Sequence, residues 1–553
     1  MGTPFPSVES LQCGKPPLRD TFPYCLKFSS PMRHYVTTAI DYPNAPPHMG
    51  HVLEKVLADV VARWFRLQGH EVRFQIGTDE HGIKIQRTAE KEGVTPRELV
   101  DRNVPLFQDL YSGLNVSYDK FIRTSNEKEH YPTVQALWKK LEAAGVLEKR
   151  SYTGLYCSGC ERFMTKRDLE DGKCPNHRTA PEEVTEENWF LTMSDYGKEL
   201  RNLLTKEWDG ESYRIVPDFR AKETLSLIDQ GLEDVSFSRP GTSLSWGVPV
   251  PGDEQQTMYV WCDALTNYIS GLGFFTDHEE SEWWNDARIT HVIGKDIARF
   301  HALIWPLMLK KAGVRIPDEL LIHGFLTSEG DKMSKSLGNV VVPDDILQKF
   351  AGNPDPLRFY LSHEVPVGRD GDFSWERFEK LYDAKLRNNL GNLLNRILVM
   401  LDKEGGSLVQ INNKSERGLH ELIPHQWEFY VESMDSFELH NAINIGGHNQ
   451  IVDFCNQDIS LMKPWEMDSE SKMRYLSELS EAMRHVSLML LPFIPDTAYR
   501  ISKQLNVPYA EAMLSKDFVI TNDMKQWGGC KDWKTVGTPE ILFAPLEDSC
   551  CSG

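Results

Sequence analysis

Two kinds of hydrophobic spacing divide the chain. Residues 34–40 are a short run rich in β-branched side chains, whereas apolar positions in 52–65 recur at steps of three and four. The first pattern predicts a strand and the second an amphipathic helix. The same patterns predict further strands at 72–76 and 320–326. The chain before residue 375 is therefore expected to mix strands with helices.

The C-terminal part has helical spacing throughout. Apolar residues at three- and four-residue steps predict helices at 375–401, 417–433, 438–461, 470–491 and 494–505. Successive helices without intervening strands indicate a helix bundle.

A turn at 42–51 joins the first predicted strand to the first predicted helix. It ends in His48, Met49, Gly50 and His51. The free N–H groups and positive dipole end of a helix attract phosphate. The two imidazoles add donors, and Gly50 lets a flat ring or a phosphate approach the backbone closely. The turn therefore predicts a nucleotide site.

A second polar segment, 332–336, reads Lys-Met-Ser-Lys-Ser and follows the strand predicted at 320–326. Lys332 and Lys335 are cations that could close over a triphosphate. Leaving pyrophosphate gains charge, so a lysine there stabilises the transition state most. Either segment alone could be an ordinary solvated loop or helix end, but the ordered pair is specific.

From about Arg33 to about Pro492 the chain resembles the class I aminoacyl-tRNA synthetases, and specifically the methionyl-tRNA synthetase family. The first signature of that family usually reads HIGH and here reads HMGH. The resemblance implies an α/β fold: a Rossmann-like parallel-sheet catalytic domain with a zinc-knuckle insertion, followed by an all-α helix-bundle anticodon-binding domain. It also implies ATP-dependent ligation of L-methionine to tRNA(Met) through methionyl-adenylate, with release of AMP and pyrophosphate.

No residue acts as a covalent nucleophile in that chemistry, so catalysis depends on positioning and charge stabilisation. The resemblance assigns this role to His48, His51 and Lys335, with Lys332 assisting. The implied ATP site consists of His48, Gly50, His51, Gly294, Asp296, Lys332, Ser334 and Lys335. Mg²⁺ is expected to accompany ATP.

The implied methionine site consists of Ala39, Ile40, Tyr42, Asp79, Trp261, Ala264, Leu265, Tyr268, Ile297 and His301. Asp79 would face the ammonium group. A thioether has only weak acceptor character, so an aromatic cage suits it. Asp41 stands where many relatives carry tyrosine or proline. An aromatic run such as 258–268 is also typical of a protein core, and that alternative stays open.

The cysteines predict a metal site. Cys157 and Cys160 form one C-x2-C knuckle, and Cys174 and His177 form a C-x2-H knuckle. Three thiolates and one imidazole suit one tetrahedral, structural Zn²⁺. A redox CxxC is the alternative, which the histidine and the lack of a thioredoxin-like unit disfavour. The other cysteines show no framework spacing, which indicates a reducing compartment.

The resemblance implies that four residues of the helical part bind the anticodon: Asn392, Arg396, Pro464 and Trp465. Unpaired loop bases are held by stacking on aromatic or arginine side chains and by hydrogen bonds. Alternatively, Asn392 and Arg396 are an ordinary helical pair and Trp465 belongs to the core.

Composition sets the outer limits. The 553 residues, 40% of them hydrophobic, allow several domains, and no apolar run approaches a membrane span. The formal charge of −20 is awkward for a tRNA-binding protein, although a local basic face would suffice. Residues 1–31 show neither a secretory core nor a convincing transit helix, and Met32 could be an alternative start. We expect a cytoplasmic protein, with a mitochondrial or plastid matrix as the alternative, and the short C-terminal end favours a monomer.

The predicted division is a flexible extension (1–32), the two catalytic halves (33–150 and 241–325), the insertion between them (151–240), a linker with the lysine loop (326–374), the helical domain (375–530) and a tail (531–553). Two other functions stay open. One is a related synthetase, such as a cysteine-specific enzyme, which usually holds its substrate on an open zinc. The other is a catalytically silent tRNA-binding scaffold, which the intact polar signatures disfavour.

Overall fold

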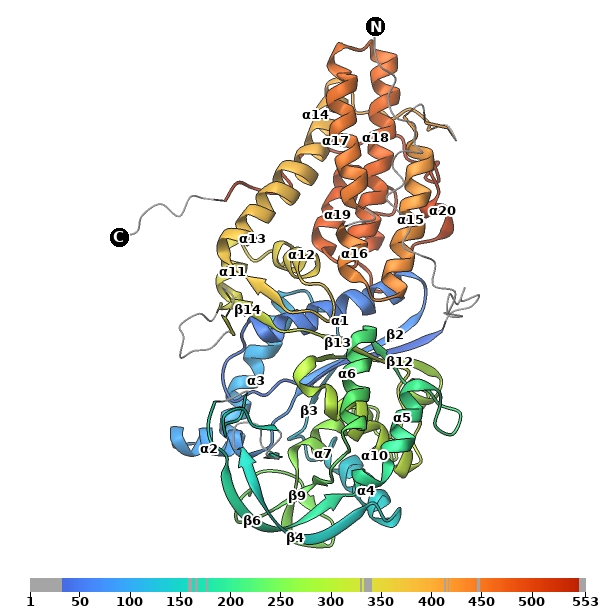
Figure 1. The fold of residues 1–553 in the computed structure, drawn as a ribbon. Helices are drawn as coiled ribbons and strands as arrows, with labels where there is room; N and C mark the ends of the chain where they lie inside the picture. Colours follow the sequence, from blue (N-terminus) through green and yellow to red (C-terminus); the bar gives the residue numbers. More distant parts are fainter. Residues whose placement is uncertain are drawn as a thin grey trace, which may run out of the picture.

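A parallel sheet organises the N-terminal part of the computed structural model (Figure 1). The structure describes residues 32–157, 162–164, 168–175, 178–328, 331–332, 341–411, 414–415, 417–444 and 448–546. Within them the six strands run, in spatial order, β3 (Lys120–Arg123), β2 (Glu71–Thr78), β1 (Arg33–Thr38), β12 (Ala287–Gly294), β13 (Glu319–His323) and β7 (Arg214–Val216). Every neighbouring pair is parallel.

The strand order reverses between β1 and β12, which are hydrogen-bonded neighbours. In open parallel sheets, ligands bind beyond the carboxyl ends of the strands at such a switch point. The central strands are almost fully buried because helices cover both faces, as parallel sheets require. A ligand site is therefore expected at the segments that follow β1, β12 and β13.

The predicted strands 34–40 and 72–76 are confirmed as β1 and β2, and the helix predicted at 52–65 is α1 (Met49–Leu67). The single strand predicted at 320–326 is wrong, because the chain leaves the sheet between β13 and β14 (Leu326–Ser328). The break occurs at Gly324, where a Cβ atom would lie 2.1 Å from the carbonyl oxygen of Arg369. Only glycine permits that close approach.

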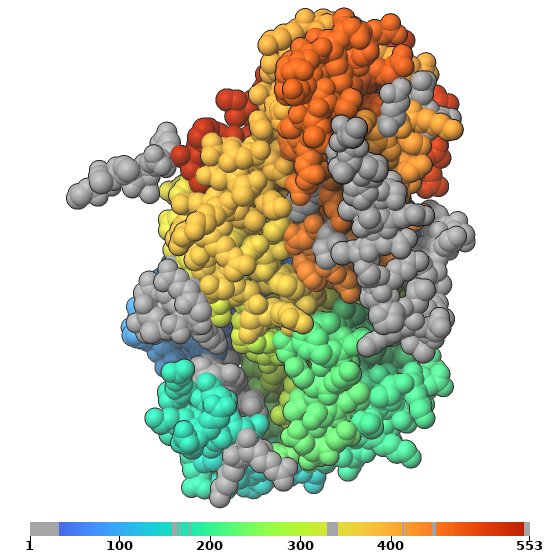
Figure 2. Space-filling model, turned by 45° about the horizontal axis from the view of Figure 1, so that its top comes forward, coloured from blue at the N-terminus to red at the C-terminus, as the bar shows by residue number. Residues whose placement is uncertain are grey.

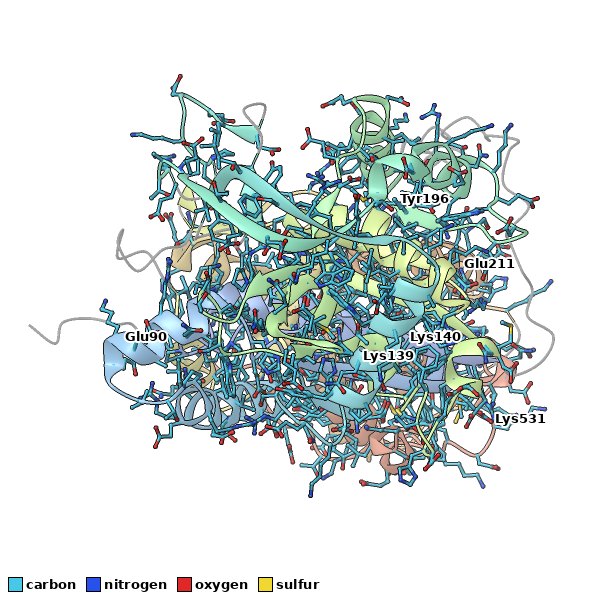
Figure 3. All side chains as sticks on the ribbon, turned by 90° about the horizontal axis from the view of Figure 1, so that it is seen from below. Glu90, Lys139, Lys140, Tyr196, Glu211 and Lys531 are labelled. Atoms are coloured by element: carbon cyan, nitrogen blue, oxygen red, sulfur yellow. The ribbon has the colours of Figure 1, made fainter. Side chains whose placement is uncertain are left out.

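An antiparallel ribbon covers the lower end of the molecule in Figure 1 and crosses the face seen in Figure 3. Its strands are, in spatial order, β5 (Arg162–Met164), β4 (Leu147–Cys157), β6 (Glu182–Leu191) and β8 (Val235–Ser236). The predicted insertion 151–240 also contains β7, which pairs with β13 and so belongs to the parallel sheet. Part of the predicted insertion therefore forms the edge strand of the parallel sheet, next to β13.

Further elements surround the two sheets. The helices are α2 (Ile83–Glu92), α3 (Pro96–Gly113), α4 (Tyr131–Ala143), η3 (Met193–Tyr196), α5 (Gly197–Thr205), α6 (Asp218–Asp229), α7 (Val260–Leu265), α8 (Asn267–Ser270), α9 (Glu282–Asn285), η4 (Lys295–Ile297), η5 (Phe300–Ile304) and α10 (Trp305–Ala312). A small antiparallel sheet consists of β9 (Ser238–Pro240), β10 (Pro249–Val250) and β11 (Asp253–Met258). In Figure 3, Glu90 of α2 and Tyr196 of η3 lie on opposite sides of this end of the molecule.

The helical part lies above the parallel sheet and forms a separate lobe, coloured yellow to red in Figure 2. Its elements are α11 (Pro343–Lys349), α12 (Asp355–Glu364), β16 (Gly371–Phe373), α13 (Trp375–Leu381), η6 (Tyr382–Gly391), α14 (Asn392–Lys403), α15 (Leu419–Asp435), α16 (Leu439–Asn444), α17 (His448–Met462), η7 (Pro464–Glu466), α18 (Ser469–Leu490), α19 (Pro495–Gln504), η8 (Glu511–Leu514) and α20 (Asn522–Lys525). The five predicted helices are confirmed, although 438–461 comprises α16 and α17, and 375–401 includes the π-helix η6.

The two lobes share one hydrophobic cluster and a buried ion pair. Arg358 of α12 lies 2.7 Å from Asp59 of α1, and both side chains are fully buried. The same guanidinium donates to the carbonyl oxygens of Pro492 and Phe493 between α18 and α19. The predicted tail also joins the helical lobe as far as residue 546, since the side chains of Trp533 and Phe543 are buried. No helix among the described residues is long and apolar enough to cross a membrane.

Candidate active site at the sheet switch point

The first turn of α1 is capped by its two histidines. His48 is the N-cap, and its Nδ1 accepts the N–H of Gly50 at 3.1 Å. The Nδ1 of His51 accepts the N–H of His48 at 3.1 Å, which completes a capping box. A Cβ atom on Gly50 would lie 2.8 Å from the His48 ring, so glycine is needed there. The ring that approaches the backbone is therefore that of His48 itself.

These bonds determine where the imidazole hydrogens lie. A neutral imidazole carries one hydrogen, and a nitrogen that accepts a bond cannot hold it. Both Nδ1 atoms accept, so both rings carry hydrogen on Nε2. Burial lowers the pKa of His51, with Lys55 adding to the effect and Asp41 opposing it, which favours the neutral form. The start of α1 thus combines helix N–H groups with two oriented imidazole donors, as an anion site requires.

The carboxyl ends of β12 and β13 lie next to this turn in the sheet. Gly294 and His323 are register partners, and a Cβ atom on Gly294 would lie 2.8 Å from the Asp296 carboxylate. Asp296 is exposed, so its carboxylate can reach a ligand beyond the sheet edge. The structure therefore brings the predicted residues Gly294 and Asp296 to the same sheet edge as the histidines.

The strand that leads into the second signature lies beside the helix of the first. Lys332 belongs to β15 (Asp331–Lys332), which pairs with β14, and β14 contacts α1. Leu326 of β14 shares a hydrophobic cluster with Met49 of α1. Ser334 and Lys335 lie outside the described residues, as does the Lys332 side chain. Strand β14, which pairs with the strand that carries Lys332, therefore packs against the histidine-capped helix α1.

Several residues predicted for the methionine site lie in one large hydrophobic cluster of the catalytic part. The Trp261 ring stacks on Phe300, with centroids 3.8 Å apart and planes 7° apart. Ala39, Tyr42, Leu265, Tyr268 and Ile297 belong to the same hydrophobic cluster as Trp261. Ala264 is buried, and Ile40 is half-buried. The structure thus brings most of the predicted set together, and it adds Phe300, which sequence reasoning missed although it precedes His301.

A hydrogen-bond chain defines the state of His301. Its Nδ1 lies 3.0 Å from the carbonyl oxygen of Ile297 and must donate to it, because a carbonyl only accepts. Its Nε2, 2.7 Å from the Tyr268 hydroxyl, is therefore the acceptor. Burial lowers the pKa of His301 to about 4, so the ring is neutral at physiological pH. A neutral, hydrogen-bonded imidazole suits a pocket for an uncharged side chain.

Asp79 and its loop are held by a buried carboxylate that the sequence did not indicate. Asp79 is 8% exposed, and its N–H donates to the carbonyl oxygen of Asp41. Asp263 of α7 lies 2.7 Å from the rings of both His81 and His130. Burial opposes ionisation, yet the two imidazoles lower the pKa of Asp263 to about 2. This cluster joins the Asp79 loop to the helix that carries Trp261.

Two cavities flank α7, and both are lined by Arg239 and Tyr259. The one bordered by Gly82 and Val260 has a volume of about 200 Å³. Arg239 is 5% exposed, and its guanidinium lies 5.0 Å from the Tyr259 ring centroid. Neither cavity is lined by a predicted methionine-site residue. Arg239 was missed because a single arginine has no distinctive spacing.

The predicted metal ligands are described in part. Cys157 and Cys174 are buried and pack together in one small cluster with Met164. Cys160 and His177 lie outside the described residues. Within the described part of the chain, no group of three potential ligands is arranged to hold a metal ion. Two buried sulfur atoms from the two knuckles fit half of a thiolate zinc site.

The predicted anticodon residues lie on the helical lobe. Asn392 begins α14 and is exposed, Arg396 is half-buried, and Pro464 is buried in η7. The Trp465 side chain is 54% exposed. The alternative that Trp465 belongs to the core is therefore wrong.

The chain belongs to the class I aminoacyl-tRNA synthetases, because the model of one of their families matches most of it. The model of the family tRNA synthetases class I (M) matches residues 34–184 and 177–398. The methionine–tRNA ligase of Clostridium perfringens is 40% identical over 88% of this chain and 75% of its own length. That of Brucella suis is 39% identical over 86% of this chain and 92% of its own length. The chain belongs to the methionine–tRNA ligase family.

Solved structures agree. The structure of Mycobacterium tuberculosis methionyl-tRNA synthetase in complex with methionyl-adenylate is 34% identical and covers 93% of this chain and 99% of that chain, with a TM-score of 0.81. The free-state structure of the same enzyme gives a TM-score of 0.76 at 30% identity. The predicted fold class and family are therefore confirmed.

Proposed function

We propose that the protein activates L-methionine with ATP and transfers it to tRNA(Met). The observation that carries this function is the first turn of α1, which follows β1 at the switch point of the parallel sheet and is capped by two imidazoles. The methionine–tRNA ligases that the chain resembles along most of its length support the same reaction.

The chemistry follows from charge. The methionine carboxylate attacks the α-phosphorus of ATP, the bond to the β-phosphate oxygen breaks, and pyrophosphate leaves with the electron pair. His48 and His51 would stabilise the phosphate charge through Nε2–H, and Lys332 and Lys335 would act on the departing pyrophosphate. The terminal ribose hydroxyl of tRNA then attacks the adenylate carbonyl and releases AMP. Mg²⁺ bound with ATP would neutralise part of the phosphate charge.

The remaining site residues have positioning roles in this proposal. Gly294 and Asp296 would hold the ribose, Asp79 the ammonium group, and the Trp261 cluster the thioether. Asn392, Arg396, Pro464 and Trp465 would bind the anticodon, and the exposed Trp465 ring supports stacking. The domain division, the monomeric state and a cytoplasmic location remain part of the proposal.

One structural Zn²⁺ is also proposed, held by Cys157, Cys160, Cys174 and His177. The two buried cysteine side chains that share one cluster support it. Elemental analysis of purified protein should find about one zinc per chain, and Cys174→Ser should reduce that content. A zinc-free wild type that folds and is active would contradict this assignment.

Amino-acid-dependent ATP–pyrophosphate exchange across the twenty amino acids, without tRNA, tests the function. A signal confined to methionine is expected. Exchange with another amino acid would contradict the methionine-site assignment, and no exchange by folded protein would favour the silent tRNA-binding scaffold.

A further inference from the structure

Lys55 is a fully buried lysine on the second turn of α1. Its ammonium group lies 2.9 Å from the Asp41 carboxylate and 2.8 Å from the Glu54 carboxylate, and it donates to the carbonyl oxygen of Ala39 at 3.0 Å. An ammonium has three N–H donors, so each has an acceptor. Burying ions costs free energy that an apolar group would avoid. The arrangement therefore invites a role besides stability.

The ion pair extends through Glu54 to a histidine on another strand. Asp41 also accepts the Tyr111 hydroxyl, and the second Glu54 oxygen lies 3.2 Å from Nε2 of His323. Nδ1 of His323 lies 2.7 Å from the carbonyl oxygen of Gly324. The side chains of Asp41, Lys55, Glu54 and His323 therefore form one connected polar chain.

Mutual attraction keeps the central pair charged. Burial would lower the pKa of Lys55, but Asp41 and Glu54 outweigh it and raise that pKa. Burial would likewise raise the pKa of Glu54, but Lys55 and His323 lower it to about 2.

This chain touches three segments of the proposed active site. Ala39 and Asp41 follow β1. Asp41 donates its N–H to the carbonyl oxygen of Gly77 in β2 and accepts the N–H of Asp79 just after β2. Lys55 lies one turn beyond His51. The Ala39 carbonyl, which accepts from Lys55 and also from the Thr38 hydroxyl at 2.8 Å, belongs to the strand end that lines the proposed methionine site.

We propose that Lys55 is a positioning residue for methionine. Its ammonium, balanced by Asp41 and Glu54, holds the Ala39 carbonyl and with it the orientation of residues 39–42. Loss of this hydrogen bond displaces the methionine site even when the protein stays folded. The inference rests on the proposed function, because it assigns residues 39–42 to methionine.

The decisive comparison is Lys55→Met against the double variant Asp41→Asn/Lys55→Met. The single variant leaves the buried Asp41 and Glu54 carboxylates without the lysine that pairs with both, and it is expected to unfold at a lower temperature. The double variant replaces Asp41 and Lys55 by neutral groups of similar size and leaves Glu54 its contact with His323. It should recover most of the lost thermal stability, yet it still lacks the donor to Ala39.

Methionine affinity, measured by calorimetry without ATP, separates the two roles. We expect the double variant to bind methionine at least about tenfold more weakly than wild type, because small displacements of a binding group cost that much or more. In exchange assays its KM for methionine should rise by a similar factor, while kcat at saturating methionine stays within about threefold. Arg63→Met is the matched control, because Arg63 pairs with buried Asp59 two turns further along α1. It should lower stability without changing methionine affinity.

The outcomes are distinct. A folded double variant that binds methionine like wild type would show that Lys55 is structural only and would overturn the inference. Equal loss of affinity in Arg63→Met would also overturn it. A wild type that neither binds methionine nor catalyses exchange would overturn the proposed function and, with it, this role of Lys55.

Discussion

The proposed methionine site and the proposed anticodon surface use tryptophan in opposite ways. Trp261 is partly buried in the catalytic lobe, where it stacks on Phe300 and meets the His301 ring edge to face. Trp465, on the helical lobe, is 54% exposed and keeps an open face. A small apolar substrate must be enclosed, whereas a nucleotide base needs only a ring to stack on. The first site therefore depends on tertiary packing, and the second on leaving a side chain uncovered.

The largest effect is expected at the histidine-capped turn, and it would sharpen the comparison by lowering catalysis without weakening tRNA binding. His51→Ala removes an Nε2–H donor and should lower kcat of methionine-dependent exchange by a factor of about 10² or more. It also removes one capping bond, which costs about 1 kcal/mol of stability. Exchange kinetics and tRNA binding measure the two lobes separately, with exposed His278→Ala as the control. Normal turnover would contradict the role of His51.

The exposed tryptophan should behave in the reverse way. Trp465→Ala removes a stacking platform, and stacking on an aromatic ring contributes about 1–3 kcal/mol per base. The KM for tRNA should rise about tenfold or more, while exchange without tRNA stays unchanged. Aminoacylation and exchange assays on the same preparation measure both. A loss of exchange activity would contradict the expectation that Trp465 acts on tRNA binding and not on methionine activation.

Acidification should weaken both lobes, because each contains a buried neutral histidine. Burial lowers the pKa of His301 to about 4, and burial with Arg484 lowers the pKa of His485 to about 4. Below pH 6.5 the two histidines bind protons in the unfolded chain, whereas their buried rings stay neutral in the folded protein. The free energy of unfolding therefore decreases as the pH is lowered. Between pH 7 and 5.5 the two should cost about 2 kcal/mol together.

Asp355 acts with the opposite sign. Burial and Asp496 raise the pKa of Asp355 to about 6, so this carboxyl group binds a proton in the folded protein at a higher pH than in the unfolded chain. That proton binding offsets about 0.8 kcal/mol of the stability lost at the histidines. For these three groups the net decrease is therefore about 1.5 kcal/mol, and other buried histidines of lowered pKa, such as His34 and His291, add to it. Urea unfolding at the two pH values measures the decrease. Increased stability at pH 5.5 would contradict the assignment of neutral histidines.

The smallest effect concerns the enclosed site. Tyr268→Phe keeps the ring but removes the hydroxyl that donates to Nε2 of His301, which leaves a buried acceptor unpaired. A hydrogen bond of this kind contributes about 0.5–1.5 kcal/mol, so the KM for methionine should rise about fivefold. Exchange kinetics at varied methionine measure it, and an unchanged KM would indicate that His301 does not shape the pocket.

Particular residues show how far sequence reasoning reached. The spacing in 52–65 predicted α1, and the order of the two signatures indicated the family before any fold was known. Sequence reasoning treated Gly50 as space for a ligand, and it did not predict that the His48 ring also lies against this glycine. The strand at 320–326 was predicted whole because Gly324 gives no local sign of the carbonyl that presses against it.

Lys55 marks the limit most clearly. In the sequence it is one polar position of an amphipathic helix, and only Asp41 attracted notice, through the resemblance. The structure buries it between a strand end and a carboxylate that reaches His323 in another strand.

The sequence by itself determined the periodic elements, their order and the chemical types at the two signatures, because these depend on neighbours along the chain. The tertiary structure alone decided which strand ends meet at the switch point, which imidazole nitrogen carries hydrogen and which lysine is buried. Those properties arise from contacts between distant residues, such as Glu54 with His323, and local spacing does not record such contacts.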